Sequence, residues 1–132
     1  MNKKTVYDFA NAINEHNTDK IFFLMADDHK FIDSHGNEAT GKDNMKAGWK
    51  GYFQLFPDYR IEITDFFDDG NIIACFGFAS GTYKGLAKEK NENYWRLPAS
   101  WKVIVENNKI KLWQVYADTK IPFDIIENNK CN

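Results

Sequence analysis

The residues best placed to do chemistry lie at the end of the last predicted hairpin. Asn107-Asn108 is typical of a two-residue turn, which fixes how the flanking strands face each other. The predicted pairs are Val105–Ile110, Val103–Leu112, Trp101–Gln114, Ala99–Tyr116 and Leu97–Asp118. Alternate side chains share one face of a strand, so this apolar face would end in Gln114, Tyr116 and Asp118. An apolar lining with a few convergent polar groups is typical of a small-molecule pocket.

Asp118 is the carboxylate that this pattern favours as a proton acceptor. Loss of hydration on an apolar face would raise its pKa and make it a better base toward a carbon acid. A second interpretation stays open, because an aspartate at a strand end often caps the next turn. Trp95 and Trp101 share the predicted face of Asp118 and are candidates for the pocket wall. Tyr83 lies where a strand reaches a polar loop and is a candidate for the pocket mouth.

The hydrophobic periodicity predicts helices first and long strands afterwards. Helices are expected over 3–16, over a short segment that Asn17 or Thr18 caps and Asp27-Asp28 ends, and over 42–56. Strands are expected over 29–35, 59–67, from 72 to about 85 and in the last hairpin, with a polar loop at 84–93 and a helical or irregular tail at 121–126. Asp69-Gly70 predicts a turn that pairs Phe67 with Ile72, Ile63 with Phe76 and Ile61 with Phe78.

This order of elements indicates the fold class. Helices collected before an antiparallel meander favour an α+β fold over a doubly wound parallel sheet. Gly77 and Gly81 inside a long strand permit a bulge or bend, so the sheet is expected to curve around the helices. The pocket would lie between the concave sheet face and the helices. A chain of 132 residues fits a single domain over 1–132.

Three more residues are candidates for ligand contact. Trp49 and Phe53 lie on the apolar stripe of the predicted helix 42–56. Such a stripe fits a plain core as well as a pocket wall. His35 lies beside the turn at Gly36, where it would reach the rim of a pocket or the surface.

Composition argues against several function classes. The net charge is −2 and no run of Lys or Arg occurs, so a nucleic-acid or anionic-membrane surface is not indicated. Cys75 lies in a predicted strand and Cys131 near the chain end, which fits reduced thiols and a cytoplasmic protein better than a disulfide. The sequence has no CxxC, HExxH or glycine-rich phosphate loop, so neither a metal nor a cofactor is predicted.

Several motifs in order resemble one superfamily. The segment from Met25 to Gly36, MADDHKFIDSHG, resembles the ADD…D..G segment of ketosteroid-isomerase-like proteins. Gly41, Phe56-Pro-Asp58, Gly81–Gly85, Leu97–Trp101 and Trp113–Asp118 resemble the SnoaL-like polyketide cyclases. Both groups belong to the nuclear transport factor 2-like superfamily, and the resemblance covers about 6–126. It implies a cone-shaped, mostly antiparallel sheet wrapped around N-terminal helices, a cystatin-like α+β barrel.

The resemblance also implies roles for two aspartates. Asp33 matches the isomerase carboxylate that shuttles a proton, although it could instead order the turn at Gly36. Asp118 matches the cyclase carboxylate that removes a proton next to a carbonyl. The isomerase oxyanion tyrosine would fall near Asn11, and its second acid near Ser100 or Trp101, so that oxyanion hole is not recognisable here. The donors that remain for an enolate are Tyr116, Gln114 and His35.

Together these features predict a pocket for a small hydrophobic molecule and an acid–base enzyme that needs no cofactor. The expected reaction is a cyclase-, isomerase- or dehydratase-type proton transfer next to a carbonyl, with Asp118 and Asp33 as the catalytic pair. The alternatives are a non-catalytic ligand-binding protein of the same fold and, less favoured, a protein-interaction module. The opposite face of the last hairpin carries Ile104 and Trp113, which predicts a homodimer through the outer sheet face.

Overall fold

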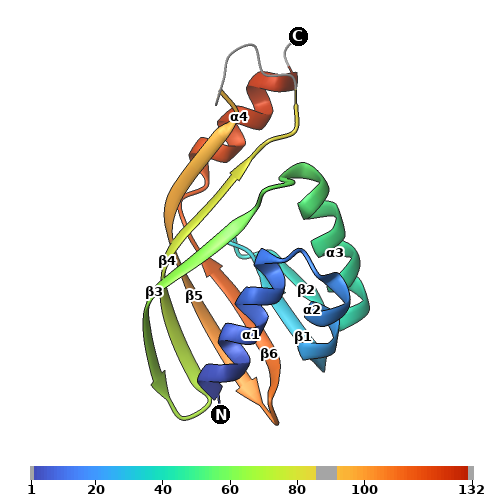
Figure 1. Ribbon diagram of the computed structural model, residues 1–132, viewed down its shortest axis with the longest axis vertical. Coiled ribbons are helices and arrows are strands. Elements are labelled where there is room, and N and C mark those ends of the chain that lie inside the picture. Colours follow the sequence, from blue (N-terminus) through green and yellow to red (C-terminus); the bar gives the residue numbers. More distant parts are fainter. Residues whose placement is uncertain (1, 86–91, 131–132) are drawn as a thin grey trace.

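The computed structural model (Figure 1) describes residues 2–85 and 92–130. Its helices are α1 (Asn2–Asn14), α2 (Thr18–Leu24), α3 (Lys42–Leu55) and α4 (Lys120–Lys130). Its strands are β1 (Met25–Ile32), β2 (Glu38–Thr40), β3 (Arg60–Asp69), β4 (Ile72–Thr82), β5 (Tyr94–Glu106) and β6 (Lys109–Tyr116). The predicted loop at 84–93 falls largely on residues 86–91, and Cys131 on the chain end, which both lie outside the described residues.

The six strands form one curved sheet with the order β2-β1-β6-β5-β4-β3. All neighbouring strands are antiparallel except β1 and β6, which run parallel. Helices α1, α2 and α3 lie on the same side of the sheet, and α4 lies at the end of the sheet away from the N-terminus (Figure 1). The predicted α+β class with a mostly antiparallel curved sheet is confirmed.

The N-terminal helices form where their apolar spacing predicts. Val6, Phe9 and Ile13 of α1 are fully buried against the sheet. Asn17 caps α2, because its side-chain oxygen accepts a hydrogen bond from the backbone N–H of Lys20 at 3.1 Å. The prediction that Asp27-Asp28 ends this helix is wrong: Met25 already pairs with Ile110 of β6, so both aspartates lie in β1.

A β-bulge changes the predicted register of the last hairpin. Asn107 and Asn108 form the predicted turn with positive φ angles, and Val105 faces Ile110 as expected. The next pair is Ile104 with Leu112, so one extra residue, Lys111, is inserted in β6. Because side chains alternate, this single insertion exchanges the two faces of β6 from there onward.

Trp113 is the residue that the exchange buries. It lies opposite Val103 and is 1% exposed, in contact with Phe9 at a ring-centroid distance of 4.9 Å. The predicted place of Trp113 on the outer face is therefore wrong. Tyr116 lies opposite Ser100 on the outer face and is 50% exposed, so its predicted inward orientation is also wrong.

The β3–β4 hairpin departs from its predicted register for a similar reason. Asp69 pairs with Ile72, so the turn is Gly70-Asn71, and a further irregularity lies between Ile63 and Asp65. The predicted single apolar face is divided as a result. Ile61 and Ile63 of β3 face the core. The other predicted members, Phe67 of β3 and Ile72, Phe76 and Phe78 of β4, lie on the other face.

Candidate ligand-binding site

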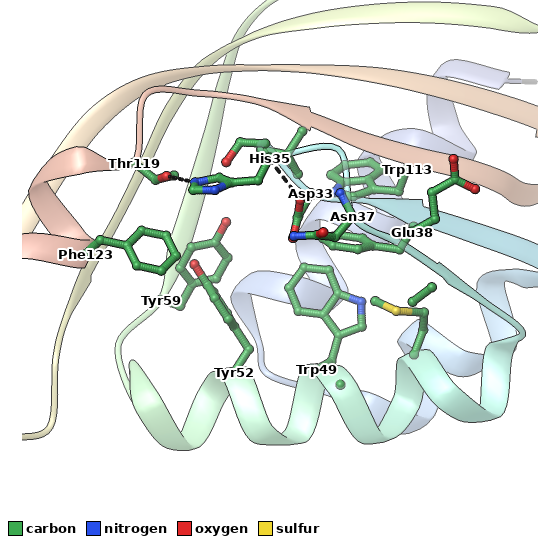
Figure 2. Close-up of a pocket in the computed structure, with 16 residues that line it drawn as sticks. Asp33, His35, Asn37, Glu38, Trp49, Tyr52, Tyr59, Trp113, Thr119 and Phe123 are labelled. Carbon is green, nitrogen blue, oxygen red and sulfur yellow. Dashed lines mark hydrogen bonds between the residues drawn. The ribbon is translucent and has the colours of Figure 1, made fainter. Parts of the chain in front are cut away.

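A cavity of about 420 Å³ lies between α3, the ends of β1 and β6, and the start of α4 (Figure 2). A volume of this size is in the range of small-molecule sites. Its walls are mostly aromatic and aliphatic, with a polar rim from the β1–β2 turn. The residues that line it are Phe31, Asp33, Ser34, His35, Asn37, Glu38, Ala39, Met45, Gly48, Trp49, Tyr52, Tyr59, Trp113, Val115, Thr119 and Phe123.

Aromatic rings at right angles form the inner wall. Trp49 and Tyr52 are three residues apart and lie on the same face of α3, with their rings 6.2 Å apart at 86°. Tyr59, just before β3, meets Tyr52 edge to face at 4.8 Å and 88°. Phe31 of β1 meets Trp49 at 6.1 Å and 78°. These four rings therefore border the cavity from several directions.

The polar groups of this wall are the hydroxyls of Tyr52 and Tyr59 and the indole N–H of Trp49, which is buried and has no hydrogen-bond partner among the described residues. Within the described residues neither hydroxyl has a hydrogen-bond partner, and Figure 2 shows both directed toward the side that holds His35 and Phe123. Burial raises the pKa of both groups, and for Tyr59 the neighbouring Tyr52 adds to the effect. Both hydroxyls are therefore neutral at physiological pH and can donate a hydrogen bond to a ligand.

Asp33 lines the cavity, but its carboxylate organises the β1–β2 turn. One oxygen accepts the backbone N–H groups of His35 and Asn37 at 2.9 Å, and the other accepts the Asn37 side-chain amide at 3.0 Å. Partial burial pushes the pKa of Asp33 upward, but these hydrogen bonds outweigh it and leave the pKa below its ordinary value. The carboxylate is thus an anion at neutral pH, and the turn-ordering interpretation fits its contacts.

His35 joins this turn to the segment before α4. Its Nε2 lies 2.8 Å from Thr119 Oγ1, and its ring packs against Phe123 with centroids 5.2 Å apart (Figure 2). The side chain is exposed on its outer side and borders the cavity on its inner side. His35 is therefore a rim residue, as the sequence predicts.

Asp118 does not lie in the cavity, and its predicted inward orientation is wrong. The bulge at Lys111 turns alternate residues of β6 outward, and Asp118 follows that strand as an exposed residue. Its carboxylate accepts the backbone N–H of Lys120 at 3.0 Å, at the first residue of α4. These contacts match the capping interpretation of this residue.

Of the ten predicted site residues, the structure brings Asp33, His35 and Trp49 together around the cavity. Phe53 is buried under His16, with the two rings stacked at 4.0 Å. Two tryptophans lie in the core: Trp95 packs on Phe56, and Trp101 contacts Trp113. Tyr83 also packs near Phe56, and Gln114 faces outward opposite Lys102.

Most residues of the cavity wall are not predicted by the sequence pattern. Tyr52 was visible on the apolar stripe of α3, three residues after Trp49, but there it is indistinguishable from core. Trp113 is predicted on the outer face, but the bulge in β6 turns Trp113 and Val115 toward the cavity. Thr119 and Phe123 belong to the end of the chain that α4 brings back over the cavity, and the sequence pattern of 121–126 gave no sign of that contact.

Two structural features bear on metal sites and membranes. Among residues 2–85 and 92–130, no group of three or more His, Cys, Asp or Glu side chains is arranged to hold a metal ion. Over the same ranges, no helix combines the length and apolarity needed to cross a membrane.

The sequence matches the SnoaL-like domain family over residues 6–113, so the chain belongs to that family. The resemblance seen in its motifs is thereby confirmed. No protein of curated function matches the sequence.

Solved structures show the same fold at low sequence identity. A ketosteroid isomerase-like protein from Catenulispora acidiphila, in complex with trimethylamine, is 19% identical with a TM-score of 0.75, covering 85% of this chain and 83% of that one. A protein from Jannaschia sp. CCS1, whose proposed activity is that of a SnoaL-like polyketide cyclase, is 12% identical with a TM-score of 0.79, covering 99% and 92%. An epoxide hydrolase from M. tuberculosis is 15% identical with a TM-score of 0.77, covering 96% and 90%. At these identities the likeness defines the fold alone.

Proposed function

We propose that this chain binds a small organic molecule with an apolar body and one hydrogen-bonding group in the cavity beside α3. The observation that carries the proposal is the pair of neutral hydroxyls, on Tyr52 and Tyr59, which are directed into an aromatic cavity and have no hydrogen-bond partner among the described residues. Buried polar groups are normally hydrogen-bonded, so a ligand atom is a natural partner for them. The ligands and activities named for the structural neighbours differ widely, so the fold does not select one molecule.

A binding experiment with tyrosine variants tests this proposal. We expect acetophenone, 2-tetralone or a related aromatic ketone to quench tryptophan fluorescence, because Trp49 lines the cavity. The double change Tyr52→Phe and Tyr59→Phe should weaken binding about 5- to 150-fold, since each lost hydrogen bond is worth roughly 0.5–1.5 kcal/mol. Tyr94→Phe is the matched control, because Tyr94 is exposed on β5 and does not line the cavity. Equal affinity in the double variant and the control would contradict the proposal.

A second candidate function is proton transfer next to a carbonyl, with His35 in place of Asp118 as the proton carrier. It is favoured by the position of the His35 imidazole at the cavity margin, where Thr119 holds one ring nitrogen and Asp33 is close. Asp33 is poorly suited to be the base itself, because hydrogen bonds already stabilise its anion.

An exchange experiment separates catalysis from binding. An enzyme of this type should speed deuterium incorporation at the carbon next to the carbonyl of 2-tetralone in D₂O, followed by NMR. The rate should fall at least about 100-fold in His35→Gln, which is the scale of general acid–base catalysis. A wild-type rate equal to that of buffer would leave the binding function alone.

We also propose that the outer sheet face is covered by a second copy of the chain. A row of paired residues crosses β4, β5 and β6 on that face, with Phe76 beside Ser100 and Ser100 beside Tyr116. Phe76 and Tyr116 are about half exposed, and Ile104 lies on the same face opposite Ile72. Exposed apolar area of this kind is typical of an interface. Sedimentation at micromolar concentration should give a dimer that Phe76→Lys dissociates; a monomeric wild type would contradict this proposal.

A further inference from the structure

We propose that the cavity selects an alkylammonium cation of the trimethylammonium type over a neutral or anionic molecule of the same shape. This inference rests on the proposed binding function and adds the charge of the ligand to it.

The first support is the geometry of the aromatic wall. Three contacts, Phe31–Trp49, Trp49–Tyr52 and Tyr52–Tyr59, have interplanar angles of 78–88°, and a fourth, Trp49–Tyr59, has 40°. All four rings line the cavity, so they border one space from different sides. The negative face of an aromatic ring attracts a cation, and several rings at right angles can contact one rounded cation simultaneously. A flat aromatic ligand, by contrast, would stack on only one of these faces.

The second support is the charge of the lining. The sequence has 17 Lys and Arg residues, yet none of the described residues that line the cavity is a lysine or arginine. The lining includes two carboxylates, Asp33 and Glu38. Lys30 pairs with the Glu38 carboxylate at 3.1 Å, which leaves Asp33 as the main negative charge of the cavity. Asp33 forms hydrogen bonds with neutral groups and no ion pair with a lysine or arginine among the described residues. His35 is the one ionisable nitrogen base among the described lining residues, and its charge interacts with Asp33.

The third support concerns anions. A site for a carboxylate or phosphate needs positively charged side chains or several convergent backbone N–H groups. The N–H groups at this rim, those of His35 and Asn37, are already taken by Asp33. The donors on the aromatic wall, the hydroxyls of Tyr52 and Tyr59 and the unpartnered indole N–H of Trp49, are neutral and suit a hydroxyl or carbonyl oxygen on the ligand.

Three probes of nearly equal shape and different charge test the inference. Choline carries a trimethylammonium group and a hydroxyl, and 3,3-dimethyl-1-butanol replaces the nitrogen by carbon. The anion 3,3-dimethylbutanoate keeps the branched head and reverses the charge. Binding is followed by tryptophan fluorescence and by calorimetry at low salt. We expect choline to bind about tenfold more tightly than the alcohol, within the range of desolvated cation–π contacts, and the anion to bind most weakly.

Variants show which side chains are responsible for the preference for a cation. Tyr52→Leu removes an aromatic face, whereas Tyr52→Phe keeps the face and removes only the hydroxyl. The preference for choline over the alcohol should fall in Tyr52→Leu and persist in Tyr52→Phe. Asp33→Asn should reduce the preference about threefold with little change in affinity for the alcohol. Asp118→Asn is the matched control, since Asp118 also accepts a backbone N–H two residues ahead but lies outside the cavity.

The outcomes separate this inference from the proposed function. Equal binding of choline and the alcohol would overturn the choice of a cation and leave small-molecule binding intact. Tighter binding of the anion than of choline would also overturn the proposed preference for a cation. If none of the three probes binds while an aromatic ketone does, the cavity takes a flat neutral molecule and the inference fails alone. If neither the probes nor the ketones bind, the proposed function fails as well.

Discussion

His35 Nε2 lies 2.8 Å from Thr119 Oγ1, across 84 residues of sequence. This hydrogen bond ties the turn after β1 to the residue just before α4, and Phe123 of α4 packs on the same imidazole. Both partners line the cavity, so the contact closes the cavity on the side of α4. The attachment of α4 and the occupancy of the cavity should therefore depend on each other.

Thr119→Val should loosen α4 and speed ligand release. Valine keeps the shape of threonine but cannot bond to His35, and one such hydrogen bond contributes about 1 kcal/mol. We expect faster hydrogen exchange at amides of α4 and a several-fold higher dissociation rate, measured by exchange mass spectrometry and stopped flow. Thr119→Ser keeps the hydroxyl and should behave like the wild type. Unchanged exchange in α4 after Thr119→Val would show that Phe123 and the rest of the helix hold it without this bond.

Asp33 should stabilise the fold in a pH-dependent way. Its folded-state pKa is lowered, so its contribution is fully present above the unfolded-state value near 3.8 and is lost as the pH falls through the lower folded value. Asp33→Asn should lower the free energy of unfolding by roughly 1 kcal/mol at pH 7, as loss of a cap does. The difference from wild type should shrink below about pH 4. Urea unfolding at pH 7, 5 and 3 measures this, and a constant difference would contradict it.

Trp113 and Tyr116 should respond very differently to truncation. Trp113→Ala removes a fully buried ring that contacts Phe9 and Trp101, and we expect a loss of about 3–5 kcal/mol. Tyr116→Ala removes a side chain that is half exposed on the outer face, and we expect a loss within about 0.5–1 kcal/mol in the monomer. Chemical denaturation of both variants tests the register of β6. A larger loss of stability in Tyr116→Ala than in Trp113→Ala would contradict this register and place Tyr116 in the core.

The bulge at Lys111 marks the limit of what the sequence could predict for the fold. Apolar periodicity identified α1, α2, α3 and the long strands, because each element buries one face over several turns or alternations. Register depends on a count of residues, so one inserted residue moves every later side chain to the other face. Asp118 was therefore assigned to the pocket by a pattern that is correct up to Ile110 and inverted beyond it.

The candidate site was harder to predict than the fold, because distant segments meet there. His35 and Thr119 are adjacent only after β1 has paired with β6 and α4 has folded back. Tyr52 carries the same apolar signature as a core residue, and only its neighbours decide that its hydroxyl faces a cavity. Asp33 lines the cavity, but its charge state depends on hydrogen bonds from Asn37 that composition and spacing cannot reveal.

Gly77 should be intolerant of any side chain. A Cβ atom at this position in β4 would lie 1.7 Å from the backbone oxygen of Glu62 in β3, so the two strands would have to separate. We expect Gly77→Ala to lower the free energy of unfolding by roughly 3 kcal/mol, at the upper end of overpacking effects. Gly51→Ala is the matched control, because its Cβ meets nothing within 4 Å and alanine favours the helix α3 by up to about 1 kcal/mol. Equal stability of the two variants would mean that the strands part easily at this point.

Tyr59 should be among the last of the six tyrosines to ionise. Burial raises the pKa of Tyr59 well above 10, and burial also raises the pKa of the neighbouring Tyr52. For a group with a raised folded-state pKa, the contribution to stability is fully present below the unfolded value of about 10 and is lost as the pH rises above it. A spectrophotometric titration near 295 nm should therefore show a late phase that coincides with alkaline unfolding. Tyr59→Phe should reduce the amplitude of that phase, and in 8 M urea all tyrosines should ionise together near about 10. A single folded-state transition at about 10, with the same amplitude in Tyr59→Phe, would contradict this prediction. It would show that the Tyr59 hydroxyl is not shielded from water by the aromatic residues around it.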